Sequence, residues 1–282
     1  MINSLVFSGG GIKIVYYLGL LKLLEEYNII NSINEFIGCS SGAIFSLLLS
    51  INFNYDELLL LFNNIFFTNF LNNYDIINII ENYGISDTNN IINIITIIIK
   101  NKLKLDNLDN FTFRDHYKLT KNKLIINGSN LTDNKCEIFS NEITPNMLII
   151  DAIKISINIP FLFKNIEYNN KIYCDGGVFS NYPIKYCNNL SNTLGIYLDF
   201  NIINIINFNN YLLSIFNIIL NKEIDNLDDK FKKNTIFIKS NINFYEFNIP
   251  KEELNQCIND GYNISKKFIQ EHSDFKKLIN ES

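Results

Sequence analysis

The chain has 282 residues and a formal net charge of −5 at pH 7, with 47% hydrophobic and 19% charged residues. This balance supports a folded core and excludes an intrinsically disordered chain. The mild acidity, without any basic run, argues against a nucleic-acid-binding protein. The five cysteines are widely spread without CxxC spacing, so we expect no disulfide framework and no metal site.

The chain opens with two strand–turn–helix units. We expect these strands and helices, in alternation, at residues 4–7, 15–27, 35–38 and 42–50. The segment 15–27 is predicted to be helical because its apolar side chains recur at helical spacing. Such alternation predicts a parallel sheet with helices packed on it.

The middle of the chain is expected to be mainly helical. The predicted helices lie at residues 55–71, 75–81, 88–102, 111–119 and 146–157. Thr144 and Pro145 are expected to be the N-cap and first residue of the last of these. The helical insertion at about 55–102 is open to two interpretations. It either covers one face of the sheet as ordinary helices or forms a lid with an apolar surface over Ser40, which lies in the turn between the strand at 35–38 and the helix at 42–50.

The remaining segments add strands and two long helices. Strands are expected at 123–127, 136–140, 193–200 and 235–239, a hairpin at 164–173, and helices at 211–221 and 250–271. No repeat or linker divides the chain, so we expect one α/β domain over residues 1–282. The N-terminus lacks the pattern of a signal peptide, and no stretch reaches the roughly 18 apolar residues of a membrane span. We therefore expect a cytoplasmic protein, soluble or membrane-peripheral.

Residues 38–42 have the pattern GxSxG, in which Gly38 and Gly42 flank Ser40. An apolar strand comes before this pattern and an apolar helix follows it. That context predicts a nucleophile elbow, where a serine sits on a sharp strand-to-helix turn and the glycines leave room for strained backbone. The backbone N–H of Ser41 would then face a developing oxyanion.

Gly9, Gly10 and Gly11 form a second glycine-rich turn, at the end of the first strand. A dinucleotide fingerprint would need a third spaced glycine where this chain has Ile14, and the spacing of a phosphate P-loop does not match either. A glycine loop at a helix N-terminus binds negative charge through free N–H groups. We therefore predict an oxyanion-binding loop, to which Lys13 adds charge unless it is simply solvated.

A serine nucleophile needs a base, and the chain has only two histidines. His116 is expected at the surface of an amphipathic helix. His272 lies in a polar tail, at the late position that an α/β-hydrolase triad would require. Asp175 is the better candidate, because it ends an apolar strand and enters a Gly-Gly turn that lets another segment approach its carboxylate. The alternative for Asp175 is a turn cap with no chemical role.

Four stretches, in this order, resemble the patatin-like phospholipase family: 9–13, 38–42, 151–161 and 175–183. The resemblance implies a three-layer α/β sandwich with a central, mostly parallel sheet flanked by helices. It also implies a Ser40–Asp175 dyad that cleaves phospholipids or other lipid esters through an acyl-enzyme, without metal or other cofactor. A membrane surface is then a compatible partner.

In this resemblance Gly9, Gly10 and Gly11 would form the oxyanion hole. The chain departs from the family at Ile14, where glycine is usual, and this bears on the packing of the following helix. Two alternatives stay open. One is an acyltransferase with the same dyad, and the other is a catalytically silent lipid-binding or interaction protein of the same fold.

Overall fold

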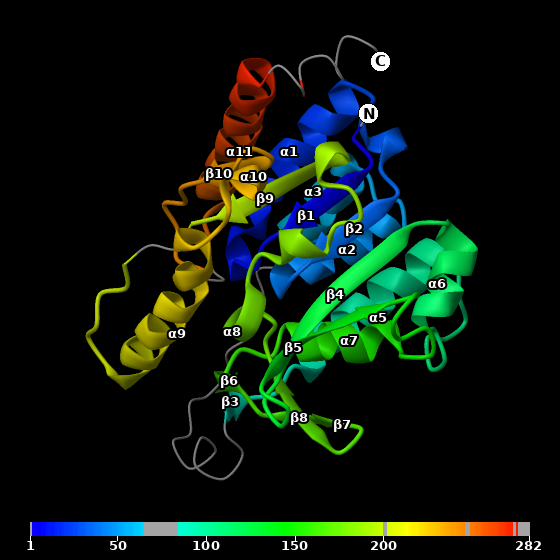
Figure 1. Cartoon of the computed structure of the whole chain (residues 1–282), viewed down its shortest axis with the longest axis vertical. Helices are drawn as coiled ribbons and strands as arrows, with labels where there is room; N and C mark the ends of the chain where they lie inside the picture. The colour runs from blue at the N-terminus through cyan, green and yellow to red at the C-terminus, as the bar shows by residue number, and fades with distance from the viewer. Residues whose placement is uncertain (1, 65–83, 200–201, 246–248, 273–274, 276–282) are drawn as a thin grey trace.

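The computed structural model describes residues 2–64, 84–199, 202–245, 249–272 and 275. Its main sheet has eight strands in the order β10-β9-β1-β2-β4-β8-β7, with β5 paired to β4 (Figure 1). These strands are β1 (Ser4–Phe7), β2 (Glu35–Gly38), β4 (Lys123–Asn130), β5 (Lys135–Ser140), β7 (Ile166–Tyr168), β8 (Lys171–Cys174), β9 (Thr193–Leu198) and β10 (Thr235–Ile238). The run from β10 to β4 is parallel, whereas β5, β7 and β8 pair antiparallel.

Helices surround this sheet. They are α1 (Val15–Glu26), α2 (Ser41–Ser50), α3 (Tyr55–Asn64), α5 (Asn89–Leu103), α6 (Phe113–Thr120), α7 (Ile149–Ser156), α8 (Gly177–Ser180), α9 (Phe208–Asp225), α10 (Asp229–Lys232) and α11 (Lys251–Glu271). Short 3₁₀ helices are η1 (Gly11–Ile14), η2 (Ile30–Ser32), η3 (Pro183–Tyr186) and η4 (Leu190–Asn192). None of the helices in the described ranges is both long enough and apolar enough to cross a membrane.

The central strands are buried on both faces. Along β1, Leu5 and Phe7 enter the large core that α1, α2, α7 and α11 share. Val6 points to the opposite face, where it packs with Tyr182 and Ile184. Strands covered on both sides read as continuous apolar runs, which is why the sequence predicts them well. The predicted three-layer sandwich with a mostly parallel sheet is confirmed.

The hairpin of β7 and β8 also forms as predicted, with both turn residues in the left-handed region at φ 50° for Asn169 and φ 60° for Asn170. The start of α7 was predicted wrongly. This helix begins at Ile149 because the Thr144 hydroxyl is used in a turn after β5, where it accepts from the Ser140 N–H at 3.1 Å.

The helical insertion contains a strand that the sequence did not reveal. β3 (Gly84–Ser86) pairs in parallel with β6 (Phe161–Phe163) in a separate two-stranded sheet. α3 covers residues 55–64 of the predicted helix at 55–71. The rest of that prediction, and the helix predicted at 75–81, lie outside the described residues.

The register of the sheet brings distant turns to one place. Gly38 pairs with Ile126 in β4, and Cys174 pairs with Ser129 of the same strand. β2 runs parallel to β4, whereas β8 runs antiparallel to it. Counting two residues beyond Gly38 and one beyond Cys174 brings both chains level with Gly128. Ser40 and Asp175 therefore meet beside the end of β4.

Candidate active site

Ser40 occupies a strained turn between β2 and α2. Its backbone has φ 52° and ψ −127°. Residues other than glycine rarely adopt this conformation, which costs about 1–3 kcal/mol. The Ser40 N–H donates to the Ser156 hydroxyl of α7 at 2.9 Å, which holds the turn. A side chain at Gly38 would collide with the Gly42 carbonyl, and one at Gly42 would collide with the Ser8 carbonyl. Both glycines are therefore needed for the close approach.

Asp175 meets Ser40 from the end of β8. The Ser40 hydroxyl donates to Asp175 Oδ2 at 2.6 Å, and the Gly177 N–H donates to Oδ1 at 2.7 Å. The side chain is 1% exposed. Burial raises the pKa of Asp175 from its ordinary 3.8 to about 7, although the two hydrogen bonds act in the opposite direction. Its carboxylate is thus a much stronger base than an exposed aspartate.

Polar residues of β4 shape the turn that carries Asp175. The Asn127 amide donates to the Ser180 carbonyl at 2.8 Å and to the Gly176 carbonyl at 3.2 Å. Ser129 accepts from the Phe179 N–H at 3.2 Å. Sequence reasoning missed both β4 residues, although polar side chains near the end of an apolar strand were an available signal.

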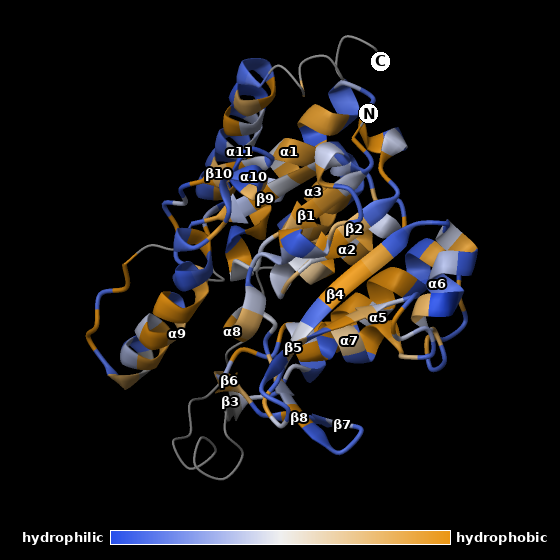
Figure 2. Ribbon diagram, viewed as in Figure 1, coloured by the Kyte–Doolittle hydropathy of each residue, from blue (hydrophilic) through white to orange (hydrophobic). Residues whose placement is uncertain are grey.

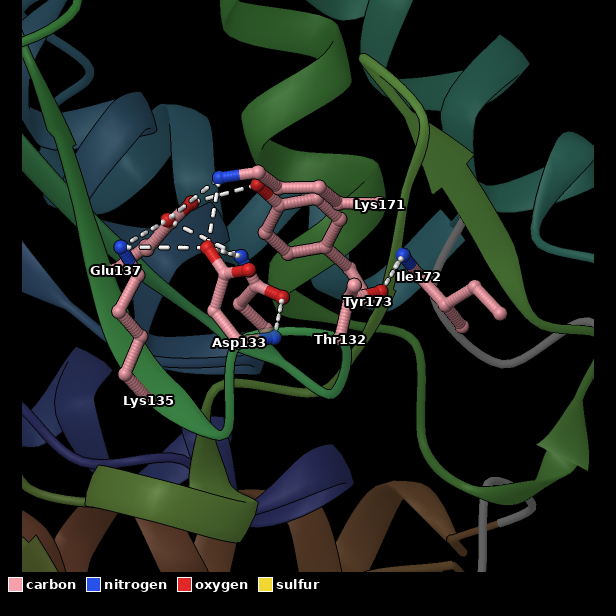
Figure 3. A network of polar contacts seen from close by, with 8 residues as sticks. Thr132, Asp133, Lys135, Glu137, Lys171, Ile172 and Tyr173 are labelled. Atoms are coloured by element: carbon pink, nitrogen blue, oxygen red, sulfur yellow. Dashed lines mark hydrogen bonds and ion pairs between the residues drawn. The ribbon is translucent and has the colours of Figure 1, made fainter.

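A network of charged side chains fixes β8, the strand that leads to Asp175. Figure 3 shows lysine and tyrosine side chains converging on Asp133 and Glu137. Lys171 Nζ lies 2.7 Å from Asp133, and the Tyr173 hydroxyl donates to Glu137 at 2.6 Å. The Ile172 N–H also donates to the Thr132 hydroxyl at 2.9 Å. These partly exposed contacts are individually weak, but together they hold β8 against the β4–β5 hairpin.

The glycine loop after β1 lies against the same turn. The Gly9 N–H donates to the Asn181 carbonyl at 3.0 Å, which ties the loop to the segment after Asp175. The Gly10 N–H donates to the Ser41 hydroxyl at 3.1 Å. Gly11 has φ +56°, and any side chain there would collide with the Phe244 carbonyl. A side chain at Gly9 would collide with the Asn181 side chain, and one at Gly10 would collide with Leu198, so each of the three positions favours glycine for its own steric reason.

Lys13 is buried, so its interpretation as a solvated lysine was wrong. Its Nζ donates to the Asp199 carbonyl at 2.7 Å, just beyond β9. The Lys13 side chain thus lies inside the protein rather than in solvent.

The histidines do not reach Ser40. His116 is 1% exposed, so its predicted surface position was wrong; Nε2 lies 2.8 Å from the Ser50 hydroxyl, and burial lowers its pKa to about 4. His272 stacks on Phe268 with ring centroids 3.9 Å apart, near the end of α11. The Ser40 hydroxyl instead contacts Asp175 directly, as the sequence predicted.

A small apolar cavity of about 60 Å³ lies beside Ser40. Besides Ser40 it is lined by Gly11, Ile12, Ile14, Ser41, Ile44, Ile91, Ile157, Ile159 and Phe163. The sequence ties Ile14 only to the packing of the following helix. In the structure Ile14 also lines the cavity at the candidate site. The lining favours a hydrocarbon group next to the Ser40 hydroxyl.

The fold and site define a class: α/β proteins with a serine at a glycine-flanked elbow and a buried aspartate as its hydrogen-bond partner. The family model for patatin-like phospholipases matches residues 5–188. The chain belongs to the patatin-like phospholipase family, which confirms the resemblance seen in the sequence. This membership supports the prediction of an ester hydrolase.

Two viral proteins are similar in sequence. The "probable lipid hydrolase 463L" of Invertebrate iridescent virus 6 is 37% identical over 186 residues, covering 64% of this chain and 62% of that protein. The chain thus matches under two thirds of that relative's length. The "uncharacterized protein R571" of Acanthamoeba polyphaga mimivirus is 29% identical over 277 residues, covering 91% of both.

Solved structures share the fold at low sequence identity. VipD from Legionella pneumophila superimposes with a TM-score of 0.67 at 17% identity, covering 96% of this chain and 67% of that one. The type III effector ExoU, from Pseudomonas aeruginosa, gives a TM-score of 0.56 at 16% identity, covering 96% and 53%. These likenesses establish the fold.

Proposed function

We propose that the chain hydrolyses fatty-acyl esters of phospholipids or other lipids, as a phospholipase A-type enzyme or a lipase. Ser40 is the nucleophile and Asp175 is its base. The observation that carries this proposal is the 2.6 Å hydrogen bond from the Ser40 hydroxyl to a buried carboxylate whose pKa is raised to about 7. A base poised near the working pH is suited to general-base catalysis.

Acylation begins when Ser40 Oγ attacks the ester carbonyl carbon and its proton passes to Asp175. The resulting oxyanion accepts hydrogen bonds from the N–H groups of Gly10, Gly11 and Ser41, with Gly9 holding the loop in place. Gly10 exchanges its present acceptor, the Ser41 hydroxyl, for the oxyanion. The intermediate collapses as Asp175 returns the proton to the leaving alcohol or lysolipid, which leaves an acyl group on Ser40.

Deacylation repeats these steps with water. Asp175 takes a proton from the water that attacks the acyl carbonyl, and the same N–H groups bind the second oxyanion. Collapse releases the fatty acid and returns a proton to Ser40 Oγ. The small apolar cavity beside Ser40 suits the methylene groups of the acyl chain that lie next to its carbonyl.

We also propose that residues 1–282 form one catalytic domain, since the main sheet takes strands from β1 near the start to β10 beyond residue 188. The five cysteines are all unpaired, in keeping with a reducing compartment such as the cytoplasm. Action at the surface of a membrane fits a lipid substrate.

The test is hydrolysis of acyl-labelled phosphatidylcholine and of a soluble short-chain ester, together with labelling by a fluorophosphonate. Wild type should turn over and label, whereas Ser40→Ala should do neither and Asp175→Asn should lose several orders of magnitude in rate. Asp229→Asn, at an exposed carboxylate, is the control and should match wild type. A wild type without turnover or labelling would overturn the proposal, and so would an active Asp175→Asn.

A further inference from the structure

Apolar side chains gather on an exposed face formed by residues 202–208 and the outer side of α9. Ile202 is 97% exposed, Ile206 77% and Ile218 69%. The other exposed members are Ile205, Phe208, Tyr211, Ile215 and Ile219. We call these eight residues the α9 face. Figure 1 shows α9 and the preceding segment projecting from the side of the molecule, and Figure 2 shows hydrophobic residues along them. Extended exposed apolar patches mark interaction surfaces.

The exposure of this face is not a by-product of folding α9. The inner side of the helix is already packed, since Phe216 and Leu220 are buried with Phe163 and Phe244. Phe208, Tyr211, Ile215 and Ile218 recur every three or four residues along the other side. α9 thus has two apolar stripes, and the inner one suffices to attach the helix to the protein.

The composition of the segment suits a lipid surface. No charged residue occurs between positions 200 and 221, and the polar residues there are asparagine, serine and tyrosine. Charges begin only at Lys222, toward the C-terminal end of α9. A charged side chain is costly in the apolar part of a bilayer, whereas uncharged aromatic and aliphatic side chains enter its interface readily.

The α9 face adjoins an apolar cavity. Ile215 and Ile219 line a cavity of about 520 Å³, a volume typical of small-molecule sites. Its other walls include Phe161, Phe163, Ile172 and Phe216. Phe163 also lines the small cavity beside Ser40. Phe163 is thus a wall shared by the cavity that adjoins the α9 face and the smaller cavity beside Ser40.

The C-terminal end of α9 is hydrogen-bonded to the segment that follows Asp175. Glu223 accepts from the Ser180 hydroxyl at 2.8 Å and from the Tyr182 N–H at 2.9 Å. Both donors follow Asp175 within seven residues in the sequence. A surface bound to α9 would consequently lie at a fixed position relative to the dyad.

We propose that the α9 face docks the protein on the surface of a lipid bilayer or aggregate and that the adjoining cavity receives the acyl chain of the substrate. This inference rests on the proposed function for the identity of the substrate. Docking itself needs only the exposed face, so binding and hydrolysis can be tested separately.

Docking is tested by flotation of the full chain with neutral phosphatidylcholine vesicles, on a Ser40→Ala background that leaves the lipid intact. The double variant Ile206→Asn/Ile218→Asn should reduce vesicle-bound protein by about tenfold or more, because two apolar side chains no longer enter the interface. The matched control is Leu119→Asn/Ile143→Asn, at residues 55% and 62% exposed away from α9, and it should float like the parent.

The same double variants are then assayed with Ser40 intact. The α9 variant should lose at least tenfold on vesicle substrate and keep turnover of a soluble short-chain ester within about twofold. Flotation of the α9 variant equal to the control overturns docking. Loss of flotation together with loss of self-association in sedimentation also overturns it, because the face is then a contact between copies. If flotation depends on α9 but wild type hydrolyses no ester, the proposed function fails while docking stands.

Discussion

Lowering the pH should switch the enzyme off through Asp175. In the proposed mechanism the carboxylate must be ionised to accept the Ser40 proton, and burial raises its pKa to about 7. At pH 5 only about 1% of such a group is ionised, so kcat/KM should be about 100-fold below its alkaline plateau. An exposed aspartate with a pKa of 3.8 would show almost no loss at that pH.

The assay is the pH dependence of kcat/KM for a soluble short-chain ester between pH 4.5 and 9, which avoids any effect of pH on vesicles. On a plot of log(kcat/KM) against pH, the acid limb should have a slope of one and a midpoint near pH 7. Asp175→Asn should show a low rate without this limb. A wild-type profile that stays flat down to pH 5 would refute the argument that burial sets the basicity of Asp175.

The same pKa shift has a consequence for stability. Asp175 has a higher pKa in the folded than in the unfolded chain, so the stability that its protonated form contributes is complete below pH 3.8. It is lost as the pH rises to about 7. The loss amounts to the order of 4 kcal/mol. In urea unfolding, Asp175→Asn should therefore gain stability relative to wild type between pH 4 and pH 8. A constant difference would contradict the shifted pKa.

Three further changes test the framework around the dyad. Ser156→Ala leaves the Ser40 N–H without its acceptor, so the free energy of unfolding in urea should fall by about 1–3 kcal/mol and kcat should fall about tenfold. An unchanged kcat would mean that the turn at Ser40 does not need this hydrogen bond. Gly42→Ala should lower the free energy of unfolding by about 1–3 kcal/mol, because the added methyl meets the Ser8 carbonyl, and an unchanged melting temperature would contradict this. Ile14→Val enlarges the cavity beside Ser40, so kcat/KM for branched acyl esters should rise relative to linear ones, and an unchanged ratio would remove Ile14 from the site.

The parts of the fold that the sequence predicts are those governed by local pattern. Central strands such as β1 and β9 are apolar on both faces, and long helices such as α11 show helical periodicity. The start of α7 failed because Thr144 forms a turn with Ser140, a choice that local capping rules do not resolve. β3 was missed because its partner, β6, lies about 75 residues later in the chain.

The sequence indicated the two residues that meet at the candidate site, but it did not indicate the residues that hold them in position. Ser40 stands out because glycines flank it on both sides, and Asp175 stands out because two glycines follow it. Ser156 and Asn127 carry no such mark, since each makes its contact only after distant segments pack. His116 was placed wrongly because its charged neighbours suggested a solvated helix, whereas its own ring turns inward to Ser50.

The proposed serine–aspartate dyad needs a stronger base than an ordinary carboxylate, and burial of Asp175 would supply this basicity without a histidine. In the described part of the chain, Asp175 accepts hydrogen bonds from the Ser40 hydroxyl and the Gly177 N–H. More donors or a nearby cation would stabilise the ionised form and lower the pKa, which would weaken the base. The burial that raises the pKa of Asp175 also places its carboxylate 2.6 Å from the Ser40 hydroxyl, so the same packing creates both the contact and the basicity.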